Sequence, residues 1–384
     1  MKPIPYGRQN ITEEDIQAVV ETLKSDFLTQ GPKIAEFEQK FAEYVGAKFA
    51  VAVCNGTAAL HISAMALNVQ TGDNVIVTPL TFAASANCVR YCSGNVVFCD
   101  IDKENYLLDL QKLETMLAKK PNGYYKGVIP VDFAGYPIHA EKLREITDKY
   151  GLWIIEDACH APGAYFIDKQ GNKQLVGNGK FAELTCFSFH PVKHIATGEG
   201  GMITTNSQEL YEKLLLFRTH GITKDADKLH ENHGGWYYEM QELGYNYRLT
   251  DFQAALGISQ LKRANEGLAR RQEITQKYIE NFQNIKGIKL PKVEQGFYHA
   301  YHLFVIQVEN RLKLYNYLKE NSIFAQVHYE PIHLQPYYKN SGNKQGDMPV
   351  AENFYAHCLS LPMYPSLTDE EQNYVIEKVK EFLE

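Results

Sequence analysis

The chain reads Leu152-Trp153-Ile154-Ile155-Glu156-Asp157 near its middle, four apolar residues followed by two carboxylates. A continuous apolar run of this kind is typical of a strand that is buried on both faces of a parallel sheet. We therefore expect the carboxylates to emerge at the carboxyl end of that strand, which is where open α/β sheets bind their ligands.

Similar apolar runs recur on both sides of this stretch, and helical patterns separate many of them. The runs cover residues 49–54, 75–78, 96–100, 128–132, 184–189 and 201–205, and the helical patterns cover 57–67, 83–91, 110–119 and 138–150. Because strand and helix alternate, the sequence predicts an α/β domain built on a mostly parallel sheet. The last two runs lack a clear helix between them, which leaves room for at least one antiparallel strand.

The two ends of the chain carry helical signals of their own. Thr12 and Asp15 have capping-box spacing before a helix with an apolar face, and Thr368 and Glu371 have the same spacing before a last helix. A long helix is expected over 251–281, followed by strands over 303–308 and 324–328. We predict an N-terminal arm and large α/β domain over residues 1–260 and a smaller C-terminal α+β domain over residues 261–384.

Composition excludes several classes of protein. The 384 residues carry a net charge of −7 without a run of Lys and Arg, which argues against a nucleic-acid-binding surface. No apolar stretch reaches the ~18 residues that a membrane span requires. Seven cysteines without a CxxC pair are typical of buried thiols in a reducing compartment, so we expect a cytoplasmic protein.

The residues that follow the predicted strands are the candidates for chemistry. Asn55-Gly56-Thr57 can bind an anion, because a glycine allows close approach and a helix start offers free N–H groups. Phe82 follows the second run, Asp157 the fifth, and Lys193 lies in a loop rich in Gly and Pro after the sixth. Each also has an ordinary explanation: a turn with a Thr cap, a core ring, a helix N-cap and a solvated cation.

Taken in order, these residues match the requirements of one cofactor. Pyridoxal 5′-phosphate needs an anion site for its phosphate, a surface for its ring, a carboxylate for its pyridine nitrogen and a lysine for its aldehyde. A lysine at the mouth of a sheet is also well placed for a lowered pKa and Schiff-base chemistry. The sequence therefore predicts an enzyme that depends on pyridoxal phosphate.

The motifs resemble those of the DegT/DnrJ-type nucleotide-sugar aminotransferases, a family of fold-type I pyridoxal-phosphate enzymes. The resemblance covers nearly the whole chain, and its clearest segments are residues 28–32, 157–161, 187–193 and 244–251. It implies a large, mostly parallel sheet domain with a small C-terminal α+β domain. It also implies a homodimer with shared active sites and an amino donor that is L-glutamate.

The resemblance also implies a role for each matching residue. Lys193 would form an aldimine with the cofactor and then move the proton between cofactor and substrate. Asp157 would pair with the pyridine nitrogen and Phe82 would stack on the ring. His160 would lie near the phenolic oxygen. The phosphate would be held by Gly56, Thr57, Ser188 and, from the neighbouring subunit, Asn246.

Within the family, the stretch 324–332 is similar to that of the branch that serves pseudaminic-acid synthesis. That branch makes UDP-4-amino-4,6-dideoxy-N-acetyl-β-L-altrosamine from the matching UDP-4-ketosugar. The residues expected at the UDP-sugar site are Tyr6, Asp26, Phe27, Leu28, Thr29, Gln326, Val327, His328 and Tyr329. A half-buried edge strand for 326–328 and a packed N-terminal arm for Tyr6 are the structural alternatives.

Other functions remain open at this stage. Enzymes for bacillosamine-type or perosamine-type sugars share the same motifs, and the stereochemistry of amination cannot be inferred from one sequence. A sugar 3-dehydratase of this fold would carry His where this chain has Lys193, and a non-catalytic sensor would not need Lys193 and Asp157 together. The histidines of the loop-rich region, His220, His230 and His233, lack accompanying Cys or carboxylate spacing, so no metal site is predicted.

Overall fold

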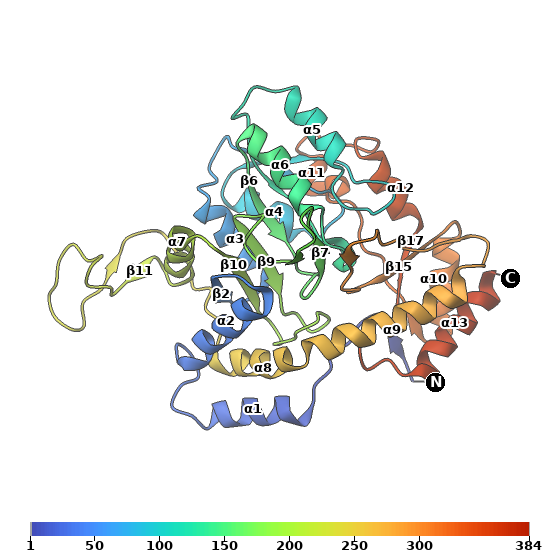
Figure 1. Cartoon of the computed structure of the whole chain (residues 1–384), viewed down its shortest axis with the longest axis horizontal. Helices are drawn as coiled ribbons and strands as arrows, with labels where there is room; N and C mark the ends of the chain where they lie inside the picture. The colour runs from blue at the N-terminus through green and yellow to red at the C-terminus, as the bar shows by residue number, and fades with distance from the viewer. Residues whose placement is uncertain (1, 384) are drawn as a thin grey trace.

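A computed structural model describes residues 2–383, and a seven-stranded sheet forms its centre (Figure 1). Its strands are β2 (Phe49–Val53), β3 (Asn74–Val77), β4 (Asn95–Phe98), β5 (Tyr125–Ile129), β6 (Trp153–Asp157), β9 (Leu184–Ser188) and β10 (Gly201–Thr205). Their order is β2-β10-β9-β6-β5-β3-β4, and β10 runs antiparallel to both of its neighbours while the other pairs are parallel. The predicted α/β domain and its antiparallel strand are confirmed.

Both faces of this sheet are buried, as the continuous apolar runs indicated. In β2, Val51 and Val53 belong to one apolar cluster, and Ala50 and Ala52 belong to another. Helices pack on the two faces: α2 (Pro32–Val45), α3 (Gly56–Ala66), α4 (Ala84–Tyr91), α5 (Leu110–Ala118), α6 (Ala140–Tyr150), α7 (Gln208–Arg218) and α8 (Asp251–Lys262). Burial of apolar area on both faces fixes the register of the central strands.

The C-terminal part forms a smaller α+β lobe, which α9 (Ala264–Phe282) joins to the large one (Figure 1). The expected helix over 251–281 is therefore two helices. The break is at Arg263, which has non-helical backbone angles (φ −113°, ψ 15°) and whose side chain is held by Asp15 and the Asn10 carbonyl. The division between residues 260 and 261 stays a prediction. Elements of this lobe are β13 (Ile288–Lys289), β15 (Phe304–Val308), β17 (Cys358–Leu361), α10 (Arg311–Glu320) and α13 (Asp369–Leu383). The helices α11 (Pro336–Lys339) and α12 (Pro349–His357) instead pack on the apolar clusters of the large domain.

The strand expected over 324–328 is wrong in extent. Only β16 (Ile323–Phe324) is regular, and it pairs with β1 (Ile4–Pro5). The Gln326 side chain accepts a hydrogen bond from the Val327 N–H at 2.8 Å, so this donor is lost to a sheet ladder. The chain then turns inward, and the His328 ring bonds to Ser360 Oγ at 2.8 Å.

Helix α1 (Glu13–Leu23) packs on α8 through its polar face. Its capping box is present, and the buried Asp15 carboxylate accepts a hydrogen bond from Gln260 Nε2 at 2.8 Å. The apolar residues at helical spacing face outward instead, with Ile16 48% and Leu23 54% exposed. An amphipathic helix that buries its polar face leaves an apolar surface open to a partner.

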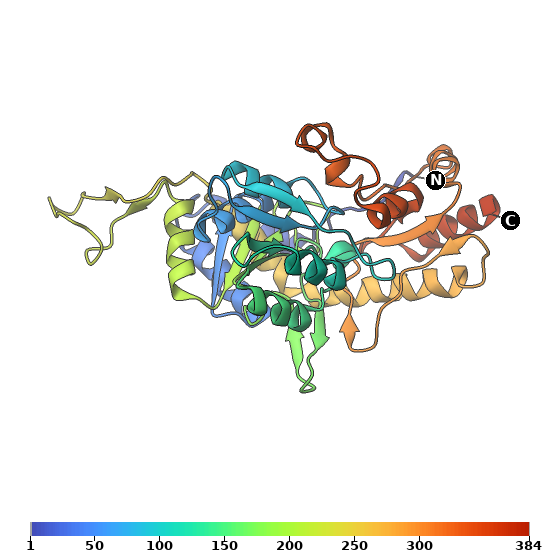
Figure 2. The same ribbon diagram turned by 90° about the horizontal axis from the view of Figure 1, so that it is seen from above.

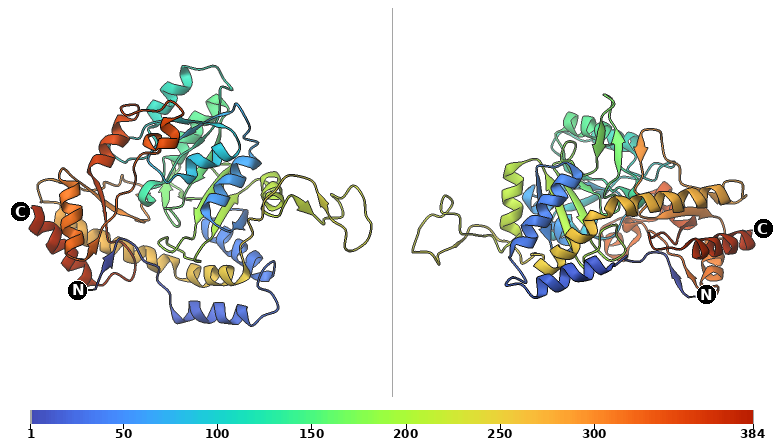
Figure 3. Two further views of the ribbon diagram at one scale, coloured as in Figure 1. Left: turned by 180° about the vertical axis from the view of Figure 1, so that it is seen from behind. Right: turned by 60° about the horizontal axis from the view of Figure 1, so that its bottom comes forward.

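Two hairpins leave the body of the molecule. β7 (Tyr165–Ile167) pairs with both β8 (Lys173–Leu175) and β14 (Phe297–Tyr298), and β11 (Ile222–Thr223) pairs with β12 (Glu239–Met240). The second hairpin belongs to an arm, residues 222–243, that projects far from the sheet in each view (Figures 2 and 3). Across residues 2–383, no helix has the length and apolar character that crossing a membrane requires.

Candidate active site

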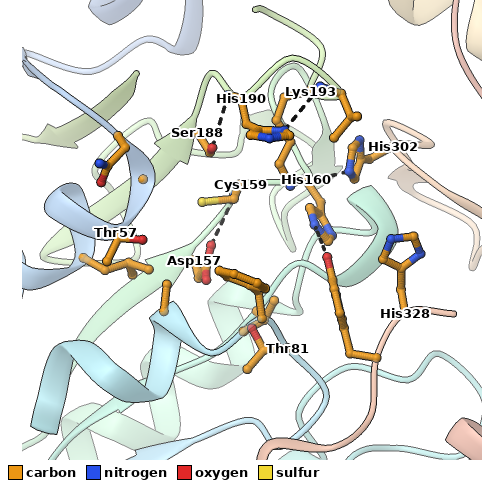
Figure 4. Close-up of a pocket in the computed structure, with 18 of the residues that line it drawn as sticks. Thr57, Thr81, Asp157, Cys159, His160, Ser188, His190, Lys193, His302 and His328 are labelled. Carbon is orange, nitrogen blue, oxygen red and sulfur yellow. Dashed lines mark hydrogen bonds between the residues drawn. The ribbon is translucent and has the colours of Figure 1, made fainter. Parts of the chain in front are cut away.

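A cavity of about 420 Å³ lies at the carboxyl ends of β2, β6 and β9 (Figure 4). Parallel strands place their carboxyl ends on one edge of a sheet, so residues far apart in sequence meet there. Ten of the residues that the sequence indicated line this cavity. They are Tyr6, Gly56, Thr57, Phe82, Asp157, His160, Ser188, Lys193, His328 and Tyr329.

Lys193 lies in the loop between β9 and β10, and its backbone N–H donates to the His190 carbonyl at 2.9 Å. Its amine reaches His302, with 3.5 Å between Lys193 Nζ and His302 Nε2. Burial lowers the pKa of the Lys193 ammonium to about 8. Far more of the amine is therefore neutral near physiological pH than for an ordinary lysine, and both nucleophilic attack and proton uptake require the neutral form.

Asp157 ends β6, and its carboxylate is held by hydrogen bonds from two directions. Ser85 Oγ donates to Asp157 Oδ2 at 2.5 Å, and the Cys159 N–H donates to Oδ1 at 3.2 Å. Ser85 is fully buried and bonds in turn to Thr81 Oγ1 at 2.6 Å. These hydrogen bonds hold the Asp157 carboxylate in one orientation. A carboxylate that pairs with a ring nitrogen needs such a fixed orientation.

The start of α3 provides the anion-binding end of the cavity. Asn55, rather than the expected Thr57, caps the helix by accepting from the Ala58 N–H at 2.8 Å. A Cβ added to Gly56 would lie 3.0 Å from the Ser188 Cβ, so only glycine leaves the backbone open to an approaching group here. The helix start and the Ser188 hydroxyl form a donor set that fits a phosphate.

Aromatic rings and neutral histidines complete the cavity. The Phe82 ring is 64% exposed although it lines the site, so its surface is free for stacking. Burial lowers the pKa of His328 to about 3 and that of His160 well below its ordinary value. His328 also contacts the Tyr6 ring, with 5.0 Å between centroids. Anion-binding backbone, aromatic face, supported carboxylate and neutral lysine together fit pyridoxal phosphate.

Several predicted residues do not line this cavity within the single chain. Asp26 and Phe27 lie at a separate hollow beside α8, the Leu28 carbonyl accepts from the Asp251 N–H, and Thr29 pairs with Thr250. Gln326 pairs with Ser360, Val327 packs against apolar clusters, and Asn246 pairs with Thr219 at the base of the arm. Their roles stay predictions, and Asn246 was expected to act on a neighbouring subunit.

Other residues in or directly behind the cavity wall had no assigned role in the sequence. Ser85 is inside α4, one turn after Thr81, and no strand-end signal marks it. His302 comes from the segment before β15 in the small lobe, and no motif in the sequence marks it. His190 and Cys159 lie inside the family-like segments 187–193 and 157–161. The His190 carbonyl accepts from the Lys193 N–H, and the Cys159 N–H donates to the Asp157 carboxylate.

Comparisons with known proteins agree with this geometry. The profile of the DegT/DnrJ/EryC1/StrS aminotransferase family matches residues 9–380. A spore coat polysaccharide biosynthesis protein of Bacillus subtilis, SpsC, is 40% identical over 99% of this chain and 97% of its own length. A UDP-4-amino-4,6-dideoxy-N-acetyl-β-L-altrosamine transaminase of Campylobacter jejuni is 37% identical over 99% of this chain and 98% of its own.

Solved structures give the same result. PseC of Helicobacter pylori, an aminotransferase involved in the biosynthesis of pseudaminic acid, superposes with a TM-score of 0.89 at 31% identity, covering 100% of this chain and 99% of its own. The PLP form of a putative sugar aminotransferase of Streptococcus pneumoniae, Spr1654, gives a TM-score of 0.89 at 29% identity, covering 99% and 98%. These likenesses extend over both lobes.

Proposed function

The chain belongs to the DegT/DnrJ/EryC1/StrS aminotransferase family, and on that premise we propose its donor, its substrate and its product. The donor is L-glutamate, and the acceptor is C4 of UDP-2-acetamido-2,6-dideoxy-β-L-arabino-hex-4-ulose. The product is UDP-4-amino-4,6-dideoxy-N-acetyl-β-L-altrosamine, a precursor of pseudaminic acid. The chain is a sugar aminotransferase of fold type I that uses pyridoxal phosphate.

One observation carries the choice of sugar. The Campylobacter relative bears the name of this transaminase and matches 99% of the chain, and the Helicobacter enzyme of the same pathway superposes over the whole chain. The higher identity to SpsC, whose name states no sugar, favours a second candidate. That candidate is another nucleotide 4-keto-6-deoxysugar, of the bacillosamine or perosamine type.

A substrate panel tests the sugar. Purified holoenzyme receives L-glutamate and, separately, the β-L-arabino ketosugar, its D-xylo epimer and a GDP-linked 4-ketosugar. Products are identified by mass spectrometry and by proton couplings at C4. Turnover of the β-L-arabino compound is expected. If the enzyme turns over the epimer or the GDP-sugar but not the β-L-arabino compound, the assigned sugar is rejected. The assignment as a sugar aminotransferase would still stand.

Pyridoxal phosphate, when bound, would supply an aldehyde carbon that carries the amino group between the two substrates and an electron-withdrawing ring that takes up the electron pair. Lys193 is proposed to hold the cofactor and, once freed, to take up and return a proton at Nζ. Its lowered pKa keeps the amine basic and leaves about half of it uncharged near pH 8. Asp157, fixed by Ser85, is proposed to hold the proton on the ring nitrogen. Phe82 covers the ring and excludes water from that face.

The proposed phosphate contacts are those of Gly56, Thr57 and Ser188, and His160 is proposed to lie near the phenolic oxygen. Tyr6, His328 and Tyr329 reach the same cavity and are proposed to contact the sugar. The remaining proposed substrate contacts, residues 26–29 together with Gln326 and Val327, lie outside the cavity of one chain. Substrate would therefore have to extend beyond the cavity, or a second chain would have to complete the site.

A homodimer with shared active sites is part of this proposal. The outward apolar face of α1 continues into Phe27 and Leu28, which are 52% and 48% exposed. The arm adds Trp236 and Leu243, both more than two-thirds exposed. Apolar surface of this extent is typical of an interface. A second copy placed there would bring Asn246, at the base of the arm, toward another chain's cavity.

A further inference from the structure

A left-handed residue beside the cavity directs a backbone N–H at His160. Ala134, in the short 3-10 turn η1 (Phe133–Gly135), has φ 59°, a left-handed conformation that is unfavourable for an L-residue. The Ala134 N–H donates to His160 Nδ1 at 3.2 Å. Gly135 follows with φ 100°, and a Cβ there would lie 2.7 Å from the His160 carbonyl, so the turn and His160 are tightly fitted.

This hydrogen bond fixes the tautomer of His160. A backbone N–H can only donate, so Nδ1 holds a lone pair and the ring proton lies on Nε2. Burial lowers the pKa of His160 well below its ordinary value, and the neighbouring Lys193, His328, His194 and His299 act in the same direction. A second ring proton is therefore excluded at working pH.

The Nε2 proton has one acceptor. Tyr329 Oη lies 3.2 Å from His160 Nε2, within hydrogen-bond distance. The Tyr329 oxygen therefore accepts, and its own O–H is not used in this contact. Among residues 2–383, no other protein group hydrogen-bonds to that hydroxyl. Burial raises the pKa of Tyr329, so the proton is retained.

The Tyr329 ring has little freedom to turn away. It packs against Phe133 and His328, with centroid distances of 6.4 and 4.8 Å, and lies on the cavity wall beside Phe82. We propose that Tyr329 is a fixed neutral hydrogen-bond donor to a negatively polarised oxygen of the bound reactants. That oxygen is the phenolic oxygen of the cofactor or the carbonyl oxygen of the ketosugar. The inference rests on the aminotransferase function, not on which sugar is used.

The first test compares wild-type holoenzyme with Tyr329→Phe, which removes the donor and keeps the ring. Without substrate, the absorption spectrum of the bound cofactor is titrated with pH. An upward shift of the midpoint by about one unit, the equivalent of a tenfold change, identifies the cofactor oxygen. An unchanged midpoint with an about tenfold slower ketosugar half-reaction, and an unchanged glutamate half-reaction, identifies the substrate oxygen. If neither changes, the proposal is overturned.

Tyr278→Phe is the matched control. Tyr278 is fully buried and donates to the Pro362 carbonyl at 3.0 Å, away from the cavity. It should lose stability without moving the spectral midpoint or either half-reaction. A general weakening of the fold is thereby separated from loss of the Tyr329 donor.

The tautomer itself is measured on the holoenzyme with 15N-labelled histidine. Two-bond 15N–1H spectra distinguish a ring protonated at Nε2 from one protonated at Nδ1, and loss of a resonance pattern in His160→Gln assigns the signals. An Nε2–H pattern that persists from pH 6 to pH 9 is expected. An Nδ1–H pattern, or protonation of both nitrogens, would overturn the inference whatever the sugar proves to be.

Discussion

The cavity wall and the arm both carry polar and aromatic residues. They differ in where those side chains find their contacts. In the wall, Asp157, Ser85 and Thr81 form a buried chain of hydrogen bonds within one chain. In the arm, Trp236 is 76% exposed, and the polar contacts are local, such as His230 with Glu239 at 2.8 Å. The hydrogen bonds of these wall residues are all made within one chain, whereas Trp236 of the arm is exposed to solvent. One chain therefore holds the acid–base groups, and the arm is the part that the proposed dimer would bury.

The largest effect is expected in the wall. Lys193→Ala should reduce turnover by at least about a thousandfold, because both the covalent anchor and the proton-transfer group are lost. The long-wavelength absorption of the bound cofactor should vanish with it. Spectra and single-turnover assays measure both losses. A variant that keeps full turnover would contradict the proposed role.

Mixing two inactive variants tests whether Lys193 and Asn246 of one active site come from different chains of a dimer. Lys193→Ala and Asn246→Ala proteins are each expected to be nearly inactive, but mixing them through mild unfolding and refolding should restore about a quarter of wild-type activity if sites are shared. The reason is that one site of each hybrid then has both Lys193 and Asn246 intact. Refolding each variant alone is the control. An inactive mixture that contains hybrids would show that Asn246 serves its own chain.

The arm itself should matter for assembly more than for folding. Trp236→Ala should raise the dimer dissociation constant by about thirtyfold, as expected for loss of one buried aromatic side chain at an interface. Sedimentation equilibrium measures the constant. Tyr124→Ala, which removes an exposed aromatic directly before β5 and outside the arm, serves as control. Equal constants for wild type and Trp236→Ala would remove the arm from the interface.

The pH dependence of cofactor uptake follows from Lys193. Because burial lowers the pKa of its ammonium to about 8, the neutral fraction falls tenfold for each pH unit below that value and levels off above it. The rate at which the apoprotein takes up pyridoxal phosphate should follow the same curve. Stopped-flow absorbance measures it. A plateau reached only above pH 10 would mean that the lysine is not desolvated.

The smallest effect is expected from Ser85→Ala. It removes one hydrogen bond from Asp157 but leaves the Cys159 N–H in place, so cofactor affinity should fall about tenfold. Ser85→Thr keeps the hydroxyl and should recover most of the affinity. Fluorescence titration of the apoprotein provides the constants. If the alanine variant binds as tightly as wild type, the Asp157 carboxylate does not depend on its buried support.

The sequence predicted the sheet and the wall because both follow from local rules. Apolar runs such as 152–155 give the strands, and Asp157 and Lys193 follow strands whose carboxyl ends must meet at one edge. His302 could not be predicted, because it enters the cavity from the other lobe and no periodicity marks it. Helix α1 shows a second limit: its apolar spacing is visible in the sequence, but not that Asp15 would turn the polar face inward to Arg263.

The antiparallel strand β10 has a consequence for the enzyme in its cofactor-free state. Ser188 and Gly201 are paired across β9 and β10, so the loop that carries Lys193 leaves and re-enters the sheet at adjacent positions. A loop closed in this way has already lost most of its freedom before any cofactor arrives. An enzyme that releases pyridoxamine phosphate after a failed cycle would thus keep its docking geometry. Reloading would then be limited by encounter rather than by refolding of the site.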